Sequence, residues 1–160
     1  MIRTHFDTAH TAWFRRKSLS GFTSPLIIAG LCAGVLLASG CSSSVSDRSV
    51  RRIDPAMATR AHADQRAVFV DVRTPEEFAA GHIPGALNLR LTDIPADGRP
   101  LPSLASARRI VVYGQNPGSA VATAMVKRLM TQGQYGTVEF FEGGLDAWRA
   151  AGGSIQRGNQ

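Results

Sequence analysis

Hydrophobic residues in the second two thirds of the chain form short runs that alternate with segments of helical spacing. Residues 67–71 (AVFVD) and 109–113 (RIVVY) are almost continuously apolar, which is typical of strands buried on both faces of a sheet. Between residues 119 and 132, Val121, Met125 and Leu129 recur at helical spacing and predict an amphipathic helix. This alternation predicts an α/β domain built on a parallel sheet with helices on both faces.

Weaker patterns predict the remaining elements. Further strands are expected at residues 51–53, 86–89 and 138–141, and further helices at 55–64, 75–80 and 145–151. Thr74 can cap a helix, Pro75 suits its first position, and Glu77 completes a capping box. Gly81 is expected to end that helix. Residues 92–106 contain three prolines and predict an irregular connection or a short helix.

The candidate site follows from this arrangement, because open α/β sheets bind ligands at the carboxyl ends of their strands. Those ends are Asp71, the loop after Tyr113, and residues 142–144 (EGG).

The N-terminal 40 residues have a different pattern. Residues 18–40 are uncharged and follow the basic cluster 15–17, and the densest apolar run covers residues 26–37. This run is shorter than the roughly 20 apolar residues of a spanning helix and fits a signal peptide. Small residues then lead to Cys41, and the sequence 38–41 (ASGC) resembles a bacterial lipobox, although Ala38 stands where leucine is preferred. The resemblance implies a signal peptide over 1–40 and a lipid on Cys41; an uncleaved anchor and an ordinary signal are the alternatives.

The charge pattern excludes nucleic acid as a partner. The chain of 160 residues carries a net charge of +6. Removing residues 1–40 leaves 14 of the 18 basic and 11 of the 12 acidic residues, spread thinly along the sequence. No basic run with interleaved aromatic residues remains, as nucleic-acid binding would require. The only cysteines, Cys32 and Cys41, lie outside the expected domain, which excludes a disulfide framework, a cysteine-ligated zinc and a cysteine nucleophile within it. No histidine cluster suggests a metal, and no cofactor is expected.

Three motifs occur in the order and spacing of a rhodanese-like domain. They are DVRTPEEF at residues 71–78, GHIPGA at 81–86 and EGGLDAW at 142–148. The sequence resembles this family over residues 51–153, after a flexible tether at 41–50 and before a C-terminal tail at 154–160. The resemblance implies a single domain with a five-stranded parallel sheet and an active-site loop directly after the strand 109–113.

The loop departs from the family at its first position. The resemblance implies that a catalytic rhodanese carries a cysteine there, which becomes a persulfide held by backbone N–H groups. In this chain the position is Gly114, and the arginine that often closes the loop is absent. The candidate binding loop comprises Gly114, Gln115, Asn116, Pro117, Gly118 and Ser119. Pro117 removes one N–H donor from it.

Further residues are candidates for a pocket beside this loop. They are Asp71, Arg73, His82, Glu142 and Gly143. A structural ion pair is the favoured interpretation of Asp71 and Arg73, with substrate contact as the alternative. For His82, local packing is favoured over proton transfer, and for Ser119 a helix cap is favoured over a nucleophile. Trp148 is expected in the core.

Three functions remain compatible with these residues. The first hypothesis is a membrane-anchored, non-catalytic rhodanese-like module that binds a partner protein or a small anion. The second is a sulfurtransferase-type protein that relies on a thiol of its partner. The third is a purely structural envelope lipoprotein. The expected location is the cell envelope on the periplasmic side. In a host with two membranes, the outer rather than the inner membrane is expected, because Ser42 follows the cysteine instead of an aspartate.

Overall fold

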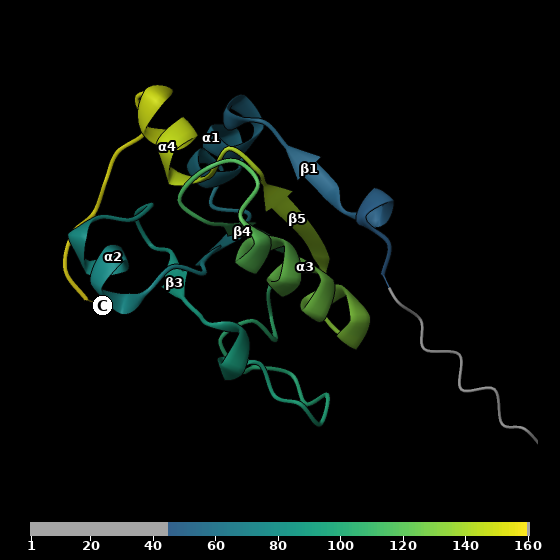
Figure 1. Ribbon diagram of the computed structural model, residues 1–160. Coiled ribbons are helices and arrows are strands. Elements are labelled where there is room, and N and C mark those ends of the chain that lie inside the picture. Colours follow the sequence, from purple (N-terminus) through teal and green to yellow (C-terminus); the bar gives the residue numbers. More distant parts are fainter. Residues whose placement is uncertain (1–44, 160) are drawn as a thin grey trace, which may run out of the picture. The chain divides into compact units, whose positions relative to one another are not determined.

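The structure, a computed structural model, describes residues 45–159, so the expected signal peptide and Cys41 lie outside the described residues. Figure 1 shows the succession of elements along the chain. The strands are β1 (Arg51–Ile53), β2 (Val68–Asp71), β3 (Leu87–Asn88), β4 (Arg109–Tyr113) and β5 (Thr137–Phe141), and the helices are α1 (Pro55–Ala63), α2 (Pro75–Ala80), α3 (Ala120–Gln132) and α4 (Gly144–Ala150). Two short 3-10 turns, Asp47–Ser49 and Leu91–Asp93, complete the set, and the second overlaps the start of the region 92–106 that was expected to be an irregular connection or a short helix.

All five strands pair in parallel, in the order β1-β5-β4-β2-β3, which confirms the expected sheet. The central strand β4 places Tyr113 opposite Asp71 of β2 on one side and Phe141 of β5 on the other. The carboxyl ends of these strands therefore meet at one edge, where the site was expected. We call this the carboxyl edge, and the opposite one the amino edge.

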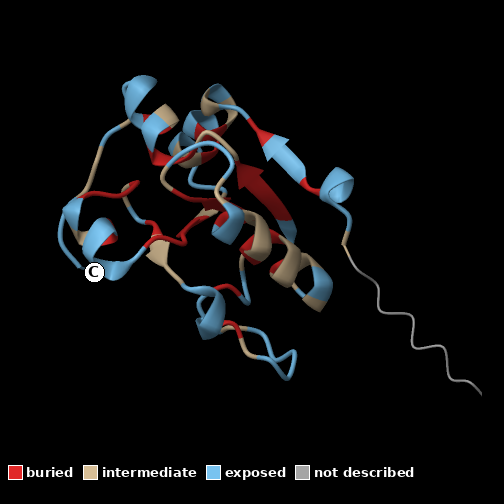
Figure 2. Ribbon diagram, viewed as in Figure 1, coloured by how far each residue is buried: buried red, intermediate tan, exposed pale blue. Residues whose placement is uncertain are grey.

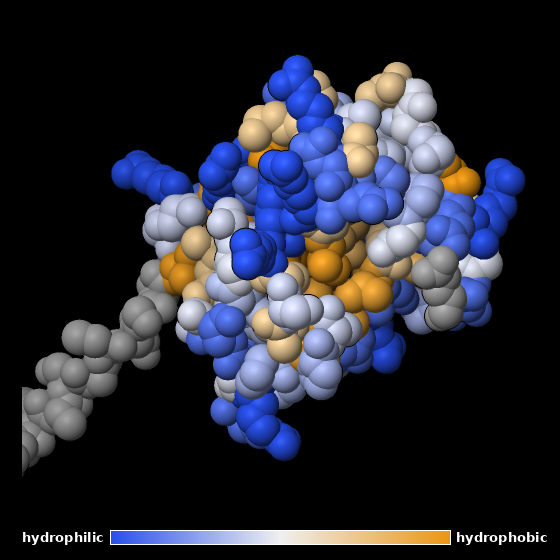
Figure 3. Space-filling view, turned by 180° about the vertical axis from the view of Figure 1, so that it is seen from behind, coloured by the Kyte–Doolittle hydropathy of each residue, from blue (hydrophilic) through white to orange (hydrophobic). Residues whose placement is uncertain are grey.

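Each face of the sheet has its own core. Along β4, Ile110 and Val112 pack on the face that α3 covers, whereas Val111 and Tyr113 pack with residues of α1, α2 and α4. Figure 2 shows mostly buried residues along β5, mostly exposed residues along β1 and mixed burial on the helices. Trp148 is 2% exposed, which confirms that it is a core residue. On the face seen in Figure 3, apolar surface is a small central area among hydrophilic side chains.

Local capping fixes where the helices begin. Thr74 accepts a hydrogen bond from the backbone of Glu77, and the Glu77 side chain accepts one from the backbone of Thr74, which confirms the predicted capping box. Ser119 accepts from Ala122 N and caps α3, as expected. The predicted apolar face of α3 is wrong at one position, because Val121 is 51% exposed and Ala122 is buried instead.

The expected flexible tether over 41–50 is wrong for the part that the structure describes. Asp47 begins a 3-10 turn, and its carboxylate lies 2.7 Å from Nζ of Lys127 on α3. The hydrogen bond and charge of Lys127 lower the pKa of Asp47. Val50 is buried in the core on the α3 side. The ordered domain therefore begins several residues before β1.

The expected C-terminal tail is also part of the domain. Gln156 and His82 exchange two backbone hydrogen bonds of 2.9 Å as an isolated antiparallel bridge. Gly158 N donates to the carbonyl of Ala79, and the indole of Trp148 donates to the carbonyl of Ser154. Residues 154–158 thus hold the turn after α2 in place. Within residues 45–159, no helix has the length and hydrophobicity needed to cross a bilayer.

Candidate functional site

The loop of residues 114–119 leaves the centre of the sheet and leads into α3. Gly114 is buried at the end of β4, whereas Asn116, Pro117 and Gly118 are exposed. Gly118 has a φ of +79°, a left-handed conformation that favours glycine. The exposed part of the loop therefore faces solvent at the carboxyl edge, in front of the first turn of α3.

The first residue of the loop has no room for a side chain in this conformation. A Cβ built on Gly114 would lie 2.5 Å from Oγ and 2.7 Å from Cβ of Ser119. Because real Cβ atoms do not approach other atoms so closely, a larger residue at 114 requires the loop to move. The helix cap thus occupies the space into which a side chain of residue 114 would extend.

The loop is also bound to the start of α4. The carbonyls of Gly114 and Gln115 accept hydrogen bonds of 2.9 Å from the backbone N–H groups of Leu145 and Asp146. Gly144 permits this close approach, because its φ is +62° and a Cβ there would lie 2.6 Å from the Gly114 oxygen. The first two carbonyls of the loop therefore face α4.

Several backbone donors of the loop remain without an acceptor. Among residues 45–159, no hydrogen-bond acceptor is found for the N–H groups of Gln115, Asn116, Gly118 and Ser119. Clustered N–H groups before a helix are a common setting for binding anions. The loop thus retains donors that a ligand can use.

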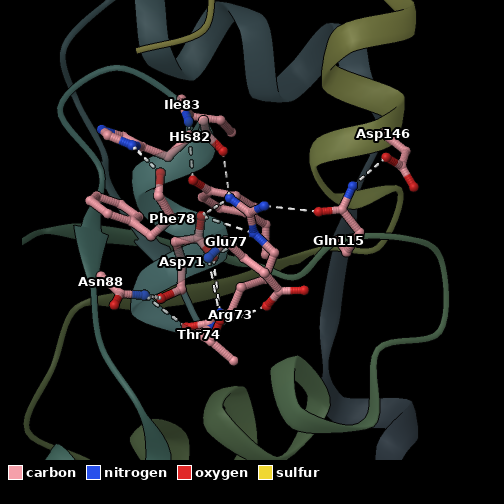
Figure 4. Close-up of polar contacts among 12 residues, drawn as sticks. Asp71, Arg73, Thr74, Glu77, Phe78, His82, Ile83, Asn88, Gln115 and Asp146 are labelled. Carbon is pink, nitrogen blue, oxygen red and sulfur yellow. Dashed lines mark hydrogen bonds and ion pairs between the residues drawn. The ribbon is translucent and has the colours of Figure 1, made fainter. Parts of the chain in front are cut away.

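A chain of polar contacts connects the loop to the end of β2 (Figure 4). Asp71 is fully buried, and its carboxylate accepts hydrogen bonds of 2.9 and 2.6 Å from Nε and Nη2 of Arg73. Nη1 of Arg73 donates to Oε1 of Gln115 at 2.8 Å, and Nε2 of Gln115 donates to Asp146 at 2.5 Å. The guanidinium also donates to the carbonyl of Gly81. Residues from four segments are thereby fixed around one arginine.

The surroundings of this network keep Arg73 charged and the neighbouring Tyr113 neutral. Burial disfavours the charged form of Arg73, but the hydrogen bonds and charge of Asp71 outweigh that effect and raise the pKa of Arg73. Burial, together with the nearby Asp71 carboxylate, raises the pKa of Tyr113 far above its ordinary value. The Tyr113 hydroxyl accepts a hydrogen bond of 3.1 Å from the backbone of Ile83. The contact between Arg73 and Asp71 confirms the ion pair that was the favoured interpretation of these two residues.

The expected pocket-lining residues do not form one group. Asp71 and His82 are fully enclosed at 0% exposure, so neither side chain lines a pocket. His82 instead packs against the end of the first motif. Its ring stacks on Phe78 with centroids 3.6 Å apart, and its Nδ1 lies 2.8 Å from the Phe78 carbonyl oxygen. Arg73 is also buried, at 8% exposure.

Glu142 and Gly143 occupy a different place. They line an open pocket of 510 Å³ together with Pro117 of the loop and residues at the end of β1 and directly after it. Glu142 is paired with Arg52 at 3.4 Å. Among residues 45–159, no group of three or more histidine, aspartate or glutamate side chains could hold a metal ion. The surface beside the exposed part of the loop is thus an open, mixed-charge hollow.

Sequence reasoning missed the role of two residues. Gln115 was expected as part of the loop, but its bridge from Arg73 to Asp146 depends on segments far apart in the sequence. Tyr113 was expected only as the end of a strand, and nothing in its local sequence indicated that its hydroxyl would accept from Ile83.

Comparison with known proteins agrees with this geometry. The rhodanese-like domain family matches residues 54–151. The thiosulfate sulfurtransferase GlpE of Pseudomonas putida is 35% identical over 100 residues, which cover 62% of this chain and 86% of that protein. A sulfurtransferase of Allochromatium vinosum is 36% identical over 104 residues, covering 64% and 92%. Among solved structures, a protein of unknown function from Rhodopseudomonas palustris, described as a possible tyrosine phosphatase, is similar with a TM-score of 0.59 and 26% identity, covering 68% of this chain and 86% of that one.

A parallel sheet in this strand order, with a loop leading from its central strand into a helix, has the architecture of a rhodanese-like fold. The chain belongs to the rhodanese-like domain family. Its relatives among the sulfurtransferases support a sulfur-handling type of domain.

Proposed function

We propose that this protein is a membrane-anchored rhodanese-like module that binds a partner protein or a small anion without forming a persulfide of its own. The observation that carries the proposal is Gly114, which directly follows β4 at the position where the family resemblance implies a catalytic cysteine. Both cysteines of the chain, Cys32 and Cys41, precede residue 45, so the domain has no thiol of its own to replace it.

Binding at the loop is supported by its unused donors. The N–H groups of Gln115, Asn116, Gly118 and Ser119 have no acceptor among the described residues, and all four positions directly precede a 13-residue helix. A bound anion would accept from such groups without covalent chemistry. Acidic side chains nearby, Glu142 and Asp146, weaken the attraction of the loop for anions, so a partner's polar surface is the other ligand class.

A titration of the described domain with thiosulfate, followed by amide NMR shifts, tests anion binding directly. The proposal predicts saturable shifts of the amides of Gln115, Gly118 and Ser119, with Gly98, an exposed glycine in another loop, unchanged. Equal small shifts at all exposed amides would show only a bulk salt effect and would reject anion binding at the loop. Binding a partner protein would then remain as the ligand class of the module.

A second function is favoured by the relatives, two of which are sulfurtransferases. In this alternative the domain holds thiosulfate beside a thiolate of a partner. The partner sulfur attacks the outer sulfur of thiosulfate, the S–S bond breaks, and a partner persulfide and sulfite are formed. Acceleration of sulfite release by the domain from thiosulfate and a small thiol would support this alternative over simple binding.

The proposed membrane anchor is a lipid on Cys41. We infer that residues 1–40 are removed and that Cys41 carries the lipid, which places the domain in the cell envelope and, in a host with two membranes, at the outer one. The mass of the N-terminal peptide of the protein purified from membranes tests this: a diacylated Cys41 is expected, and an intact residue 1–40 segment would contradict it.

A further inference from the structure

The two edges of the sheet differ in charge. Because all strands are parallel, residues that precede strands lie at the amino edge and residues that follow strands lie at the carboxyl edge. Arg66 precedes β2 and Arg108 precedes β4, whereas Asp54 follows β1 and Glu142 follows β5. The acidic first turn of α2 also lies after β2. The domain is thus more basic at its amino edge and more acidic at its carboxyl edge.

The two arginines at the amino edge share a pocket. An open hollow of 680 Å³ is lined by Arg66 and Arg108, with Gln65 and Ser106 beside them. Both arginines are exposed, and within residues 45–159 neither has an ion-pair partner. The neighbouring Arg109 shares the buried Glu139 carboxylate with Arg51, at 2.6 and 3.0 Å.

Acidic groups near the hollow cancel its charge only in part. Asp64, two residues before Arg66, forms no ion pair within the described part of the chain and sets one negative charge against the two arginines. Asp97 is paired with Arg99 and Asp47 with Lys127. The hollow therefore presents two free guanidinium groups, which suit phosphate oxygens.

The polypeptide enters the domain at the same edge. The first described residues lie at the tail of the β1 arrow, next to the tail of β5 (Figure 1). Asp47 and Val50 hold this segment against α3. Only four residue steps separate Cys41 from Val45. At about 3.6 Å per residue they span at most about 14 Å.

We propose that the amino edge, centred on Arg66 and Arg108, docks on the anionic headgroups of a lipid bilayer. The inference rests on the lipid anchor at Cys41, which holds this edge within a short distance of the membrane. Electrostatic attraction acts over about 8–10 Å at ordinary salt, so the edge comes within its range whenever the four-residue connection is less than fully extended. The opposite edge, with the loop of residues 114–119, then faces away from the membrane and stays open to its ligand.

Binding of the unlipidated domain, residues 45–160, to vesicles tests the surface without the anchor. Both core clusters lie between Val50 and Ile155, so this part keeps its complete core. We expect binding to phosphatidylcholine vesicles that contain phosphatidylglycerol and no binding to phosphatidylcholine alone. The double variant Arg66→Gln/Arg108→Gln should weaken binding about 25-fold, since each basic residue near an anionic surface contributes about fivefold.

The matched control removes the same charge elsewhere. Arg52 is paired with Glu142, and Arg157 lies in the segment beside α2, so the variant Arg52→Gln/Arg157→Gln should bind at least about five times better than the hollow variant. Equal loss in both variants would show a general charge effect and would overturn the proposal. Absence of binding to the anionic vesicles would overturn it as well, whatever the mass of the Cys41 peptide shows.

The orientation has its own readout. Because residues 45–160 contain no cysteine, Ser106→Cys in the hollow and Asn116→Cys in the loop each provide a single labelling site. On vesicles with a lipid-borne quencher, a fluorophore at position 106 should be quenched and one at position 116 should not. Equal quenching, or the reverse order, would contradict docking through the amino edge.

Discussion

Ser119 occupies the space next to Gly114 into which any side chain at that position would point. Its Oγ and Cβ would lie 2.5 and 2.7 Å from a Cβ at residue 114. The loop has therefore closed around a glycine instead of keeping an empty place for a larger residue. This relationship decides how the chain responds when a thiol is introduced.

Replacing Gly114 by cysteine should destabilise the domain. The forced displacement of Ser119 resembles overpacking of a core, which costs about 1–3 kcal/mol. The double variant Gly114→Cys/Ser119→Gly should recover most of that loss, because a glycine cap is only a few tenths of a kcal/mol worse than serine. Urea unfolding of the three proteins measures the difference. A single variant as stable as the original chain would show that the loop opens without cost.

Gly144 should tolerate no side chain. Its Cβ would meet the carbonyl of Gly114, and its positive φ is unfavourable for alanine by about 1–2 kcal/mol even without a clash. Gly98 is a matched control, since its φ is +79° but a Cβ added there would have no atom within 4 Å. Thermal or urea unfolding should show a clearly larger loss for Gly144→Ala than for Gly98→Ala. Equal losses would mean that the contact with the loop does not matter.

The Arg73–Asp71 pair should be far more important than a similar pair on the surface. Arg73→Met leaves the buried Asp71 carboxylate without its partner, a change that costs about 3–5 kcal/mol. Arg99 and Asp97 have the same spacing in the sequence but are both exposed, so Arg99→Met should leave the urea midpoint nearly unchanged. Similar effects of the two substitutions would contradict the structural role of Arg73.

The raised pKa of Tyr113 should make the free energy of unfolding fall at alkaline pH. Its pKa in the folded state lies above the ordinary value of 10.0. Just above that pH the tyrosine therefore ionises in the unfolded chain but stays protonated in the folded one, which favours unfolding. Its stabilising effect is complete below pH 10.0 and is lost as the pH rises above that value towards the folded pKa. Between about pH 10 and 11 the original chain should lose about 1 kcal/mol more than Tyr113→Phe. Parallel pH profiles of the two proteins would refute the shift.

The parts of this structure that sequence could predict are those that neighbouring residues decide. The capping box of Thr74 and Glu77 and the apolar run of β4 need only local information, and both are confirmed. The predicted buried face of α3 was wrong at Val121. The neighbouring Ala122 is buried instead, and small residues carry little hydrophobic signal in a sequence.

Long-range contacts explain the remaining differences. Gln115 meets Arg73 and Asp146 only after three segments have folded together. The pairing of residue 156 with His82 likewise could not be inferred from a short polar tail. Arg66 and Arg108 are 42 positions apart in the printed sequence, and their shared hollow exists only because β2 and β4 are neighbours in the sheet.

The transfer of sulfur from thiosulfate to cyanide by purified residues 45–160 measures whether the domain has sulfur-transfer chemistry of its own. Gly114→Cys/Ser119→Gly serves as the variant in which a thiol is present and has room. Because the domain lacks a thiol, we expect no turnover above the buffer blank for the original domain, whether or not the variant becomes active. Turnover by the original domain would contradict it, because the reaction would then proceed without a thiol in the fold.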